Sequence, residues 1–344
     1  MKIVDKYSSE AIDAWLASRA DATPFHRPAW MTAIEKACGH KVHYLVAEDG
    51  SGGILGLLPL HEVRSMLFGR ALVSSGFAVS GGILADDPAV VAALAEAAWA
   101  LAQRLGCPSL ELKGGMLPIE PAWHVSEDSY AGFVRPLAAD DEAELLAIPR
   151  KQRAEVRRAL GFDLDVRIGT KAIDRSDHYR VYSESVRNLG TPVFPRKLFD
   201  SVLDSFGEQA DILTVSHQGE PIASVLSLYH QGVVMPYWGG GTRGARALRA
   251  NDLMYYALMG HAKKRGCSAF DFGRSKFGTG AFGFKKNWGF TPEPLAYAVR
   301  TADGAAPRAI NPLNPKYRLQ IAMWQRLPLM IANIAGPVIA RGLG

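Results

Sequence analysis

The sequence has only three cysteines and lacks a long apolar run. Cys38, Cys107 and Cys267 are widely spaced and belong to no CxxC or Cys/His cluster, which argues against a cysteine-based zinc site and a disulfide framework. No segment approaches the roughly 18 apolar residues of a membrane-spanning helix. The first ten residues also have no signal-peptide core. We therefore expect a cytoplasmic protein with reduced, buried thiols.

Several catalytic signatures are also missing. There is no GxSxG elbow, no GK[ST] phosphate loop, and no histidine with a nucleophile or carboxylate at motif spacing. Gly278, Gly280 and Gly283 spell GxGxxG after a strand, but the residues that follow cannot form the long helix that should receive a pyrophosphate. These absences exclude a Walker loop and argue against a hydrolase triad and a dinucleotide site.

The composition describes a globular chain of two domains. Its 344 residues exceed one ordinary core and suit two domains of roughly 150 residues each. Apolar residues make up 48% and charged residues 21%, so neither disorder nor a fibrous structure is indicated. The formal charge of +5 and the pI near 9.0 favour partners that carry phosphates or carboxylates.

One series of elements occurs in both halves of the chain. Apolar spacing predicts helices, a meander of three strands, a long helix and a further strand, first over 10–114 and again over 143–272. A duplicated mixed α/β domain explains this repetition. We predict an α/β fold of two tandem domains with mixed central sheets, residues 1–136 and 137–301, followed by a linker and amphipathic tail, 302–344.

A short strand leads into a glycine-rich cationic loop at residues 269–290, AFDFGRSKFGTGAFGFKKNWGF. Glycines let backbone N–H groups approach a ligand, and Arg274, Lys276 and Lys285 supply positive charge. We expect a mobile loop that contacts a ligand.

Two further basic segments could hold phosphates. Arg243 and Arg246 precede a long predicted helix that Asn251 can cap, so backbone amides and arginines together favour an anion there. Arg150 and Arg153 share one face of the helix predicted over 143–160, which would suit an RNA or a nucleotide-linked substrate. The alternatives are a basic turn without a ligand and a solvated helix face.

The C-terminal tail combines apolar residues and Trp324 with cations. This pattern is typical of an interfacial membrane segment and also of a terminal helix packed on its own domain. We expect packing on the protein, with peripheral contact to the inner membrane as the alternative.

The second half of the chain resembles the FemAB (FemABX) family, whose members have two tandem acyltransferase domains of the GNAT type. The resemblance is carried by IPRKQRAEVRRALGFDLDV, VYSESVRNLGTPVFPRKLFD, the GEPIASVLSLYHQGVVMPYWGGG meander, NDLMYYALMGHAKKRG, and FDFG followed by GAFGFKKNWGF. Nearly the whole chain, including PFHRPAW and NPLNPKYR, looks most like the FemAB-related proteins associated with PEP-CTERM/exosortase and exopolysaccharide loci.

The resemblance implies an N-acyltransferase. Family members move an amino acid from aminoacyl-tRNA to an amine of a peptidoglycan precursor, and their Phe-Lys pair falls on Phe284 and Lys285. A family arginine at the phosphorylated acceptor falls on Arg196, and the tyrosine that ends the meander strand is Tyr237, with Trp238 beside it. Lys285 would then stabilise an oxyanion while Phe284 packs against a substrate.

The proton acceptor and both substrates remain open. Asp271 or a substrate phosphate could take the amine proton. TRGARALRAND does not match the coenzyme A loop Q/R-x-x-G-x-G/A, so aminoacyl-tRNA is the expected donor and acyl-CoA or acyl carrier protein the alternative. No coiled-coil arm is present, so interpeptide synthesis in peptidoglycan is not assumed.

The expected acceptor is an anionic small molecule or a lipid-linked amine from envelope or exopolysaccharide biosynthesis, and tRNA is a further candidate partner. No permanently bound cofactor and no metal are expected. A rival hypothesis from another class is a non-catalytic GNAT-like module that holds an anionic glycan, a nucleotide-sugar or a membrane surface.

Overall fold

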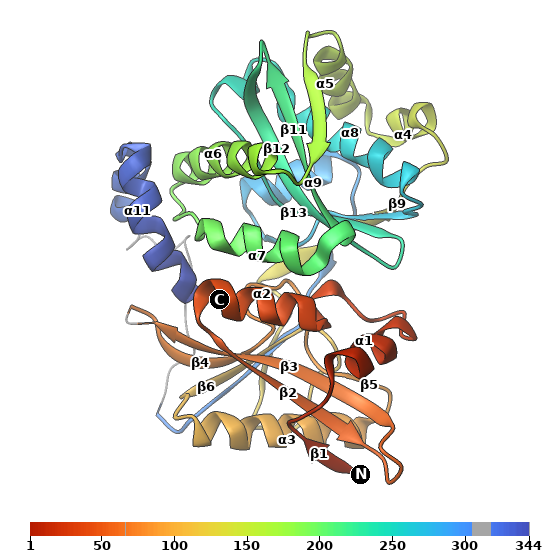
Figure 1. Cartoon of the computed structure of the whole chain (residues 1–344), viewed down its shortest axis with the longest axis vertical. Helices are drawn as coiled ribbons and strands as arrows, with labels where there is room; N and C mark the ends of the chain where they lie inside the picture. The colour runs from red at the N-terminus through yellow and green to blue at the C-terminus, as the bar shows by residue number, and fades with distance from the viewer. Residues whose placement is uncertain (66, 305–317, 344) are drawn as a thin grey trace. The chain divides into compact units, whose positions relative to one another are not determined.

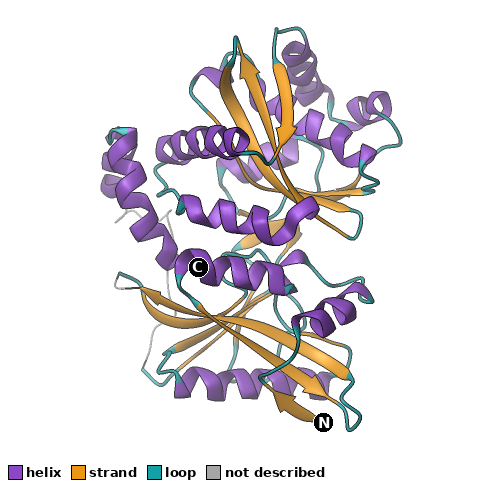
Figure 2. Ribbon diagram, viewed as in Figure 1, coloured by secondary structure: helices purple, strands orange, loops and turns teal. Residues whose placement is uncertain are grey.

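The computed structural model describes residues 1–65, 67–304 and 318–343, and these residues form two compact units. Unit 1 contains residues 1–128, 295–304 and 338–343, and unit 2 contains residues 129–294 and 318–337. Each unit has a β-sheet with helices on both faces (Figure 2). The predicted fold, a duplicated mixed α/β domain, is confirmed.

Unit 1 is built on an eight-stranded mixed sheet with the order β1-β2-β3-β4-β6-β17-β7, and β5 also pairs with β3. Neighbouring strands are antiparallel except β4 and β6, which pair in parallel through Leu72 with Leu110 and Val73 with Glu111. The strands are β1 Lys2–Val4, β2 Lys41–Glu48, β3 Ile54–Ser65, β4 Gly69–Ser74, β5 Leu84–Ala85, β6 Ser109–Lys113, β7 His124–Ser126 and β17 Tyr297–Thr301.

The helices of unit 1 cover both faces of this sheet: α3 lies on one face, and α1 and α2 lie on the other (Figure 1). Helix α3 begins where the Asp87 side chain accepts a hydrogen bond from the Ala89 N–H, and α2 ends at Gly39 in the left-handed region, with φ 74°. These helices are α1 Ser9–Ala17, α2 Pro28–Cys38 and α3 Pro88–Arg104, with a 3₁₀ turn at Pro24–His26.

Unit 2 repeats this plan with a six-stranded sheet of order β10-β11-β12-β13-β14-β9. Its parallel pair is β13 and β14, the counterparts of β4 and β6. A small three-stranded sheet, β15-β8-β16, lies in the same unit. The strands are β8 Tyr130–Gly132, β9 Val134–Pro136, β10 Asp165–Gly169, β11 Ala210–His217, β12 Glu220–His230, β13 Val233–Gly241, β14 Ala269–Asp271, β15 Ser275–Lys276 and β16 Glu293–Pro294.

Helices α6 and α7 cover one face of the sheet in unit 2, and α8, flanked by α5, covers the other (Figure 1). The α8 face forms a core rich in aromatic side chains, among them Phe133, Phe270 and Trp288, which are fully buried. The helices are α4 Asp141–Ala147, α5 Arg150–Leu160, α6 Ala172–Leu189, α7 Arg196–Phe206, α8 Ala250–Lys264 and α9 Gly280–Asn287, with 3₁₀ turns at Gly207–Gln209 and Gly244–Arg246.

Three local predictions differ from the structure. The helix expected over 143–160 is two helices, because Pro149 has no N–H to continue the first one. The expected loop at 273–290 contains helix α9, whose start is capped by the Thr279 side chain. Asn251 does not cap α8; Arg249, with φ 54°, occupies that position, and Asn251 lies in the first turn.

The limits of the two units also differ from those expected. Residues 134–136 form strand β9, which pairs with β14 in unit 2, so the division lies between residues 128 and 129 rather than at 136. Strand β17 follows unit 2 in the sequence, yet it pairs with β6 and β7 and thereby joins unit 1. Strand pairing between distant segments, which local sequence patterns do not encode, sets both limits.

The tail forms helices α10 Arg318–Arg326 and α11 Leu329–Ala340, followed by a 3₁₀ turn at Arg341–Leu343. In unit 2, α10 packs against α6, where the Arg187 guanidinium donates to the Gln325 carbonyl at 3.2 Å and Gln325 donates to the Asn188 carbonyl at 3.2 Å. Most of the linker expected at 302–313 lies outside the described residues. Among the described helices, none has the length and apolar character needed to cross a membrane.

Candidate functional site

Unit 2 contains a cavity of about 590 Å³ at the end of strand β13, where the chain turns into α8. Four elements besides β13 form its wall: the C-terminal half of α6, the 3₁₀ turn at Gly244–Arg246, the first turns of α8, and α9. The lining residues are Ser185, Asn188, Leu189, Gly239, Gly240, Gly241, Thr242, Arg243, Arg246, Asn251, Tyr255 and Phe284.

The cavity exists because β13 and β14 separate. The two strands pair only through Val233 with Ala269 and Val234 with Phe270, whereas β13 continues to Gly241. The register against β12 also shifts between Pro236 and Trp238, so that Tyr237 is an additional residue in the strand. A bulged strand that leaves its parallel neighbour opens the sheet to a ligand.

Glycines at the end of β13 allow α6 and the 3₁₀ turn before α8 to approach the strand closely. A Cβ on Gly240 would lie 2.6 Å from the Ser185 Cβ on α6, and a Cβ on Gly241 would lie 2.8 Å from the Ala245 Cβ. Both distances are too short for real side chains, so these positions require glycine. Their exposed backbone therefore becomes part of the cavity wall.

Two buried amide oxygens in this cavity have no hydrogen-bond partner among the described residues. They are the side-chain oxygens of Asn188 on α6 and Asn251 on α8. A buried acceptor without a donor costs roughly 1–3 kcal/mol, so a ligand that brings N–H or O–H donors would be stabilised here.

Two arginines line the cavity at the turn before α8. Arg243 and Arg246 are exposed, and among the described residues no carboxylate forms an ion pair with either guanidinium. The third arginine of the turn, Arg249, is instead paired with Glu155 at 2.5 Å. The wall at Arg243 and Arg246 therefore favours an anionic group such as a phosphate.

Tyr255 and Phe284 form the apolar side of the cavity. Their ring centroids lie 5.8 Å apart, and Tyr255 also packs edge-on against Phe272 at 4.7 Å. Burial raises the pKa of Tyr255 to about 12, because the phenolate would lose its hydration. The Tyr255 hydroxyl is therefore protonated at neutral pH and able to donate.

Lys285 follows Phe284 in α9, but it does not belong to the residues that line the cavity. Its Nζ donates to the carbonyl of Arg274 at 2.8 Å and to that of Gly273 at 3.2 Å, and it lies 5.3 Å from the centre of the Phe133 ring. Burial lowers the pKa of Lys285 to about 8, with Asp271 opposing this shift.

Asp271 ends strand β14, and its carboxylate accepts the Gly273 N–H at 2.7 Å. Burial raises the pKa of Asp271, an effect that this hydrogen bond and the charge of Lys285 oppose. Asp271 and Lys285 together hold the loop between β14 and β15. Among the described residues, no group of three or more His, Cys, Asp and Glu side chains could hold a metal ion.

The other predicted site residues lie outside the cavity lining. Trp238 is buried against Phe199, at a centroid distance of 5.0 Å, and Tyr237 packs on Trp238 at 4.8 Å. The Arg274 guanidinium lies 4.7 Å from the Tyr130 ring.

The three predicted arginines on other helices are also outside the lining. On α7, Arg196 lies 3.9 Å from Asp200. On α5, Arg150 is exposed and Arg153 half-buried. Of the predicted set, the structure therefore brings Phe284, Arg243 and Arg246 together in the cavity.

Sequence reasoning missed the α6 wall and Tyr255. Ser185 and Asn188 belong to no motif and reach the cavity only through the packing of α6 on β13. The glycine triplet at 239–241 was a usable signal, because three glycines at the end of a strand imply a close approach of neighbouring elements.

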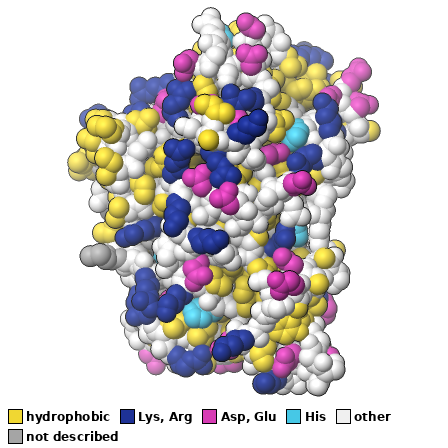
Figure 3. Space-filling model, viewed as in Figure 1, with side chains coloured by type: hydrophobic (Ala, Val, Ile, Leu, Met, Phe, Trp, Pro, Cys, Tyr) yellow, Lys and Arg dark blue, Asp and Glu magenta, His cyan; other side chains and the backbone are white. Residues whose placement is uncertain are grey.

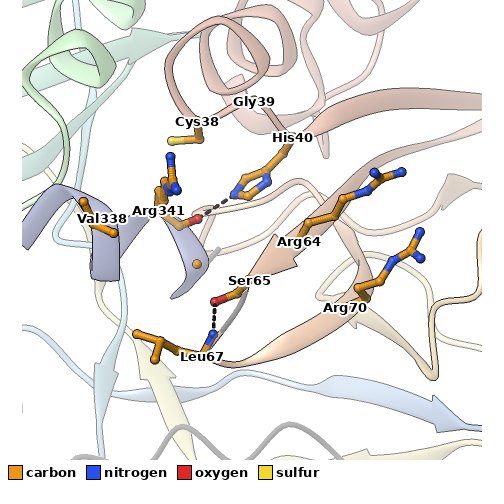
Figure 4. Close-up of a pocket in the computed structure, with 10 residues that line it drawn as sticks. Cys38, Gly39, His40, Arg64, Ser65, Leu67, Arg70, Val338 and Arg341 are labelled. Carbon is orange, nitrogen blue, oxygen red and sulfur yellow. Dashed lines mark hydrogen bonds between the residues drawn. The ribbon is translucent and has the colours of Figure 1, made fainter.

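A second cavity, of about 330 Å³, lies in unit 1 (Figure 4). The His40 ring bonds the Arg341 carbonyl at 2.6 Å, and the Arg341 guanidinium points toward Cys38. Burial raises the pKa of Cys38 to about 12, so its thiol is not a nucleophile at neutral pH.

The two remaining arginines of this second cavity, Arg64 and Arg70, both pair with the buried Glu62, at 2.8 and 2.7 Å. Their charge is therefore partly neutralised. The cavity in unit 2 is the stronger candidate for chemistry, since among the described residues its two arginine side chains form no ion pair and two of its buried acceptors have no donor.

Comparison with known proteins places this cavity within a matched domain. Residues 149–286 match the family model described as an acetyltransferase (GNAT) domain, and they include every residue that lines the cavity. No curated protein matches the sequence at a significant level.

Solved structures show the same fold over nearly the whole chain. A crystal structure of FemX is similar with a TM-score of 0.67 and 13% identity, covering 87% of this chain and 97% of that one. A tandem GNAT protein from the clavulanic acid biosynthesis pathway is similar with a TM-score of 0.56 and 14% identity, covering 89% of this chain and 99% of that one. The C-terminal domain of a putative lysylphosphatidylglycerol synthetase from Agrobacterium fabrum is similar with a TM-score of 0.55 and 13% identity, covering 86% of this chain and 92% of that one. At such low identities these likenesses establish the fold alone.

Proposed function

We propose that unit 2 transfers an acyl or aminoacyl group from an activated, phosphate-bearing donor to an amine. The observation that carries the proposal is the cavity at the end of β13. Its lining includes two arginines whose guanidinium groups form no ion pair among the described residues, and two buried amide oxygens that have no hydrogen-bond partner there. The match of residues 149–286 to an acetyltransferase (GNAT) domain supports the same reaction class.

The donor's phosphates fit the turn before α8. Arg243 and Arg246 supply positive charge, and α8 begins at Ala250, so the positive end of its dipole lies in the same turn. Coenzyme A and the acceptor end of a tRNA both carry phosphates; in coenzyme A the pantetheine arm separates them from the thioester. Amide or amine N–H groups of the bound substrates are suitable donors to the Asn188 and Asn251 oxygens.

In the transfer, the amine nitrogen bonds to the acyl carbon, and the bond from that carbon to the donor's sulfur or oxygen breaks. We assign Tyr255 as the acid that protonates the leaving group, because its hydroxyl is protonated at neutral pH and lines the cavity. The amine's proton passes to water or to a substrate phosphate. Phe284 forms the apolar side against which the acyl group packs.

The predicted roles of Lys285 as oxyanion stabiliser and Asp271 as base remain predictions. Lys285 uses two of its three N–H donors on the carbonyls of Gly273 and Arg274, which leaves one for a substrate oxygen. Arg196, Tyr237 and Trp238 likewise remain candidates for acceptor binding.

More specifically, we propose that the protein is a FemAB-type transferase. Its donor would be an aminoacyl-tRNA, and its acceptor an anionic or lipid-linked amine from envelope or exopolysaccharide biosynthesis. An acyl-CoA or acyl carrier protein donor is the alternative. The structural likeness to FemX is compatible with the first, and the acetyltransferase domain match is compatible with the second. The association with PEP-CTERM systems remains a prediction from the resemblance.

Thermal-shift titration of the full chain separates these donors. A ligand that binds only the folded state raises Tm with its concentration, so acetyl-CoA, coenzyme A and a charged tRNA mixture are compared with uncharged tRNA and inorganic phosphate. We expect one donor class to raise Tm well above the phosphate control. If no donor does so, and a nucleotide-sugar or anionic glycan stabilises the chain instead, the non-catalytic module is the better account.

A further inference from the structure

The two C-terminal helices leave large apolar side chains in solvent. Leu319 and Met323 on α10 are 72% and 62% exposed, and Met330 and Ile334 on α11 are 73% and 72% exposed. Each pair is spaced i, i+4 and so lies on one face of its helix. Hydrophobic side chains gather over α11 (Figure 3). Exposed apolar side chains that share one face of a helix are typical of an interaction surface.

The opposite side of the same helices already packs on unit 2. Ile321 lies against Gly190, and a Cβ on Gly336 would lie 2.9 Å from the Val193 nitrogen. The Asn333 amide donates to the Ser183 hydroxyl at 3.4 Å, and Ala332 is only 2% exposed. The exposed apolar side chains therefore contribute little to holding the helices in place.

The net positive charge of the sequence lies in this tail. Residues 304–344 contain five Lys and Arg and no Asp or Glu, whereas the whole chain contains 39 Lys and Arg and 34 Asp and Glu. The remaining 303 residues therefore have 34 of each sign and no net charge. The formal charge of +5 thus belongs entirely to the segment that carries the apolar face.

We propose that α10 and α11 bind the surface of an anionic lipid bilayer. Leu319, Met323, Met330 and Ile334 enter the boundary between headgroups and acyl chains, and cations such as the exposed Arg326 lie at the level of the lipid phosphates. Apolar side chains alone would suit a protein groove equally well, but a strictly basic segment favours a negatively charged surface. This proposal does not rest on the acyl-transfer chemistry.

Vesicle flotation of the full chain tests the apolar face. Vesicles of phosphatidylcholine alone are compared with vesicles that contain phosphatidylglycerol. The double variant Met330→Ser/Ile334→Ser should partition at least about tenfold more weakly. The matched control Ile119→Ser/Ile173→Ser, at positions 93% and 56% exposed outside the tail, should bind as the wild type does.

The electrostatic part has its own pair of variants. Arg326→Glu should weaken binding to phosphatidylglycerol vesicles by roughly fivefold or more, an effect that 1 M salt removes, while Arg104→Glu on α3 should not. The proposal is overturned if the wild type does not float with anionic vesicles, or if Met330→Ser/Ile334→Ser binds them undiminished. A dimer in sedimentation velocity that this variant abolishes, without vesicle binding, would assign the face to a second copy of the chain.

Discussion

The two units share a fold but differ at the equivalent place in their sheets. In unit 1 the series β2-β3-β4-α3-β6 ends in a parallel β4/β6 pair, and in unit 2 the series β11-β12-β13-α8-β14 ends in a parallel β13/β14 pair. The segment between the third strand and the long helix is the candidate site in unit 2. The corresponding segment of unit 1 is part of the core.

In unit 1 side chains fill the space after the third strand. The Trp30 indole N–H donates to the Gly76 carbonyl at 3.1 Å, the Gly76 N–H donates to His61 at 2.9 Å, and Ser75 donates to the Phe25 carbonyl at 2.7 Å. Trp30, His61 and Ser75 are fully buried. In unit 2 glycines occupy the end of the strand, and the space remains open.

The charges before the long helix differ as well. Helix α3 follows Asp86 and Asp87, which would repel an anion, whereas α8 follows a turn with Arg243 and Arg246. The two units therefore share a fold, whereas the candidate site of unit 2 has no counterpart at the equivalent place in the described part of unit 1. The acetyltransferase domain match likewise covers residues 149–286, which lie in unit 2.

The largest expected effect is the loss of stability when the buried Trp30 of unit 1 is truncated. Trp30→Ala should lower the free energy of unfolding by about 3–5 kcal/mol, because it leaves a cavity in the core. Donor affinity of the protein that remains folded should not change. Urea denaturation and donor titration at low temperature measure the two quantities, and Trp30→Phe is the milder variant if the first does not fold. A folded variant that no longer binds donor would place a binding site in unit 1.

The next effect is the pH dependence of stability due to Lys285. Its pKa is about 8 in the folded chain and 10.5 when unperturbed, so between these values the unfolded chain binds more protons and stability rises with pH. The rise is roughly 3 kcal/mol at most; below pH 8 the burial cost is fully present.

Denaturation of the wild type and of Lys285→Met from pH 7 to 10.5 measures this rise as a difference between the two proteins. The exposed neighbour Lys286→Met should retain the wild-type slope. If Lys285→Met has that slope too, the ammonium is not buried as described. The same variant also tests catalysis, since full turnover without Lys285 would remove it as oxyanion stabiliser.

Reversing the charges of the unit 2 turn should have a smaller but specific effect. Arg243→Glu/Arg246→Glu should weaken donor binding by about tenfold per arginine, because each loses a charge-assisted contact and gains repulsion. Arg104→Glu, at the end of the equivalent helix α3, should have no effect. Donor titration by calorimetry decides the matter, and equal affinity in both variants would place the phosphates elsewhere.

The smallest expected effect is a weakening of donor binding when a methyl group is added at Gly240. Gly240→Ala forces α6 away from β13 or narrows the cavity, since the added Cβ meets the Ser185 Cβ at 2.6 Å. Donor binding should weaken roughly tenfold, while the circular dichroism spectrum stays unchanged. Gly50→Ala, where no atom lies within 4 Å of the added Cβ, is the matched control. Unchanged binding in Gly240→Ala would mean that the donor does not reach the end of β13.

Local patterns in the sequence predicted much of the fold. Periodicity located the helices and the two strand meanders, because each is encoded by neighbouring residues. The pairing of β17 with β6 could not be predicted, since nothing near residues 297–301 specifies a partner almost 200 residues earlier.

The lining of the candidate cavity could be predicted only in part, because some of its residues meet through tertiary packing. Arg243 and Arg246 stood out as a basic turn before a helix, whereas Asn188 reaches the cavity only through tertiary packing. Phe284 and Lys285 were expected to act together in a loop. Because they lie in helix α9, their side chains diverge by about 100°, and only Phe284 lines the cavity.

Unit 2 alone is expected to provide the donor site. Isothermal titration calorimetry of the full chain, with acetyl-CoA and with a charged tRNA mixture, tests it most directly because it counts sites. We expect one site per chain for one of these donors, lost in Arg243→Glu/Arg246→Glu and retained in Arg104→Glu. Two sites per chain, or one site that survives the reversal of both arginines, would contradict it.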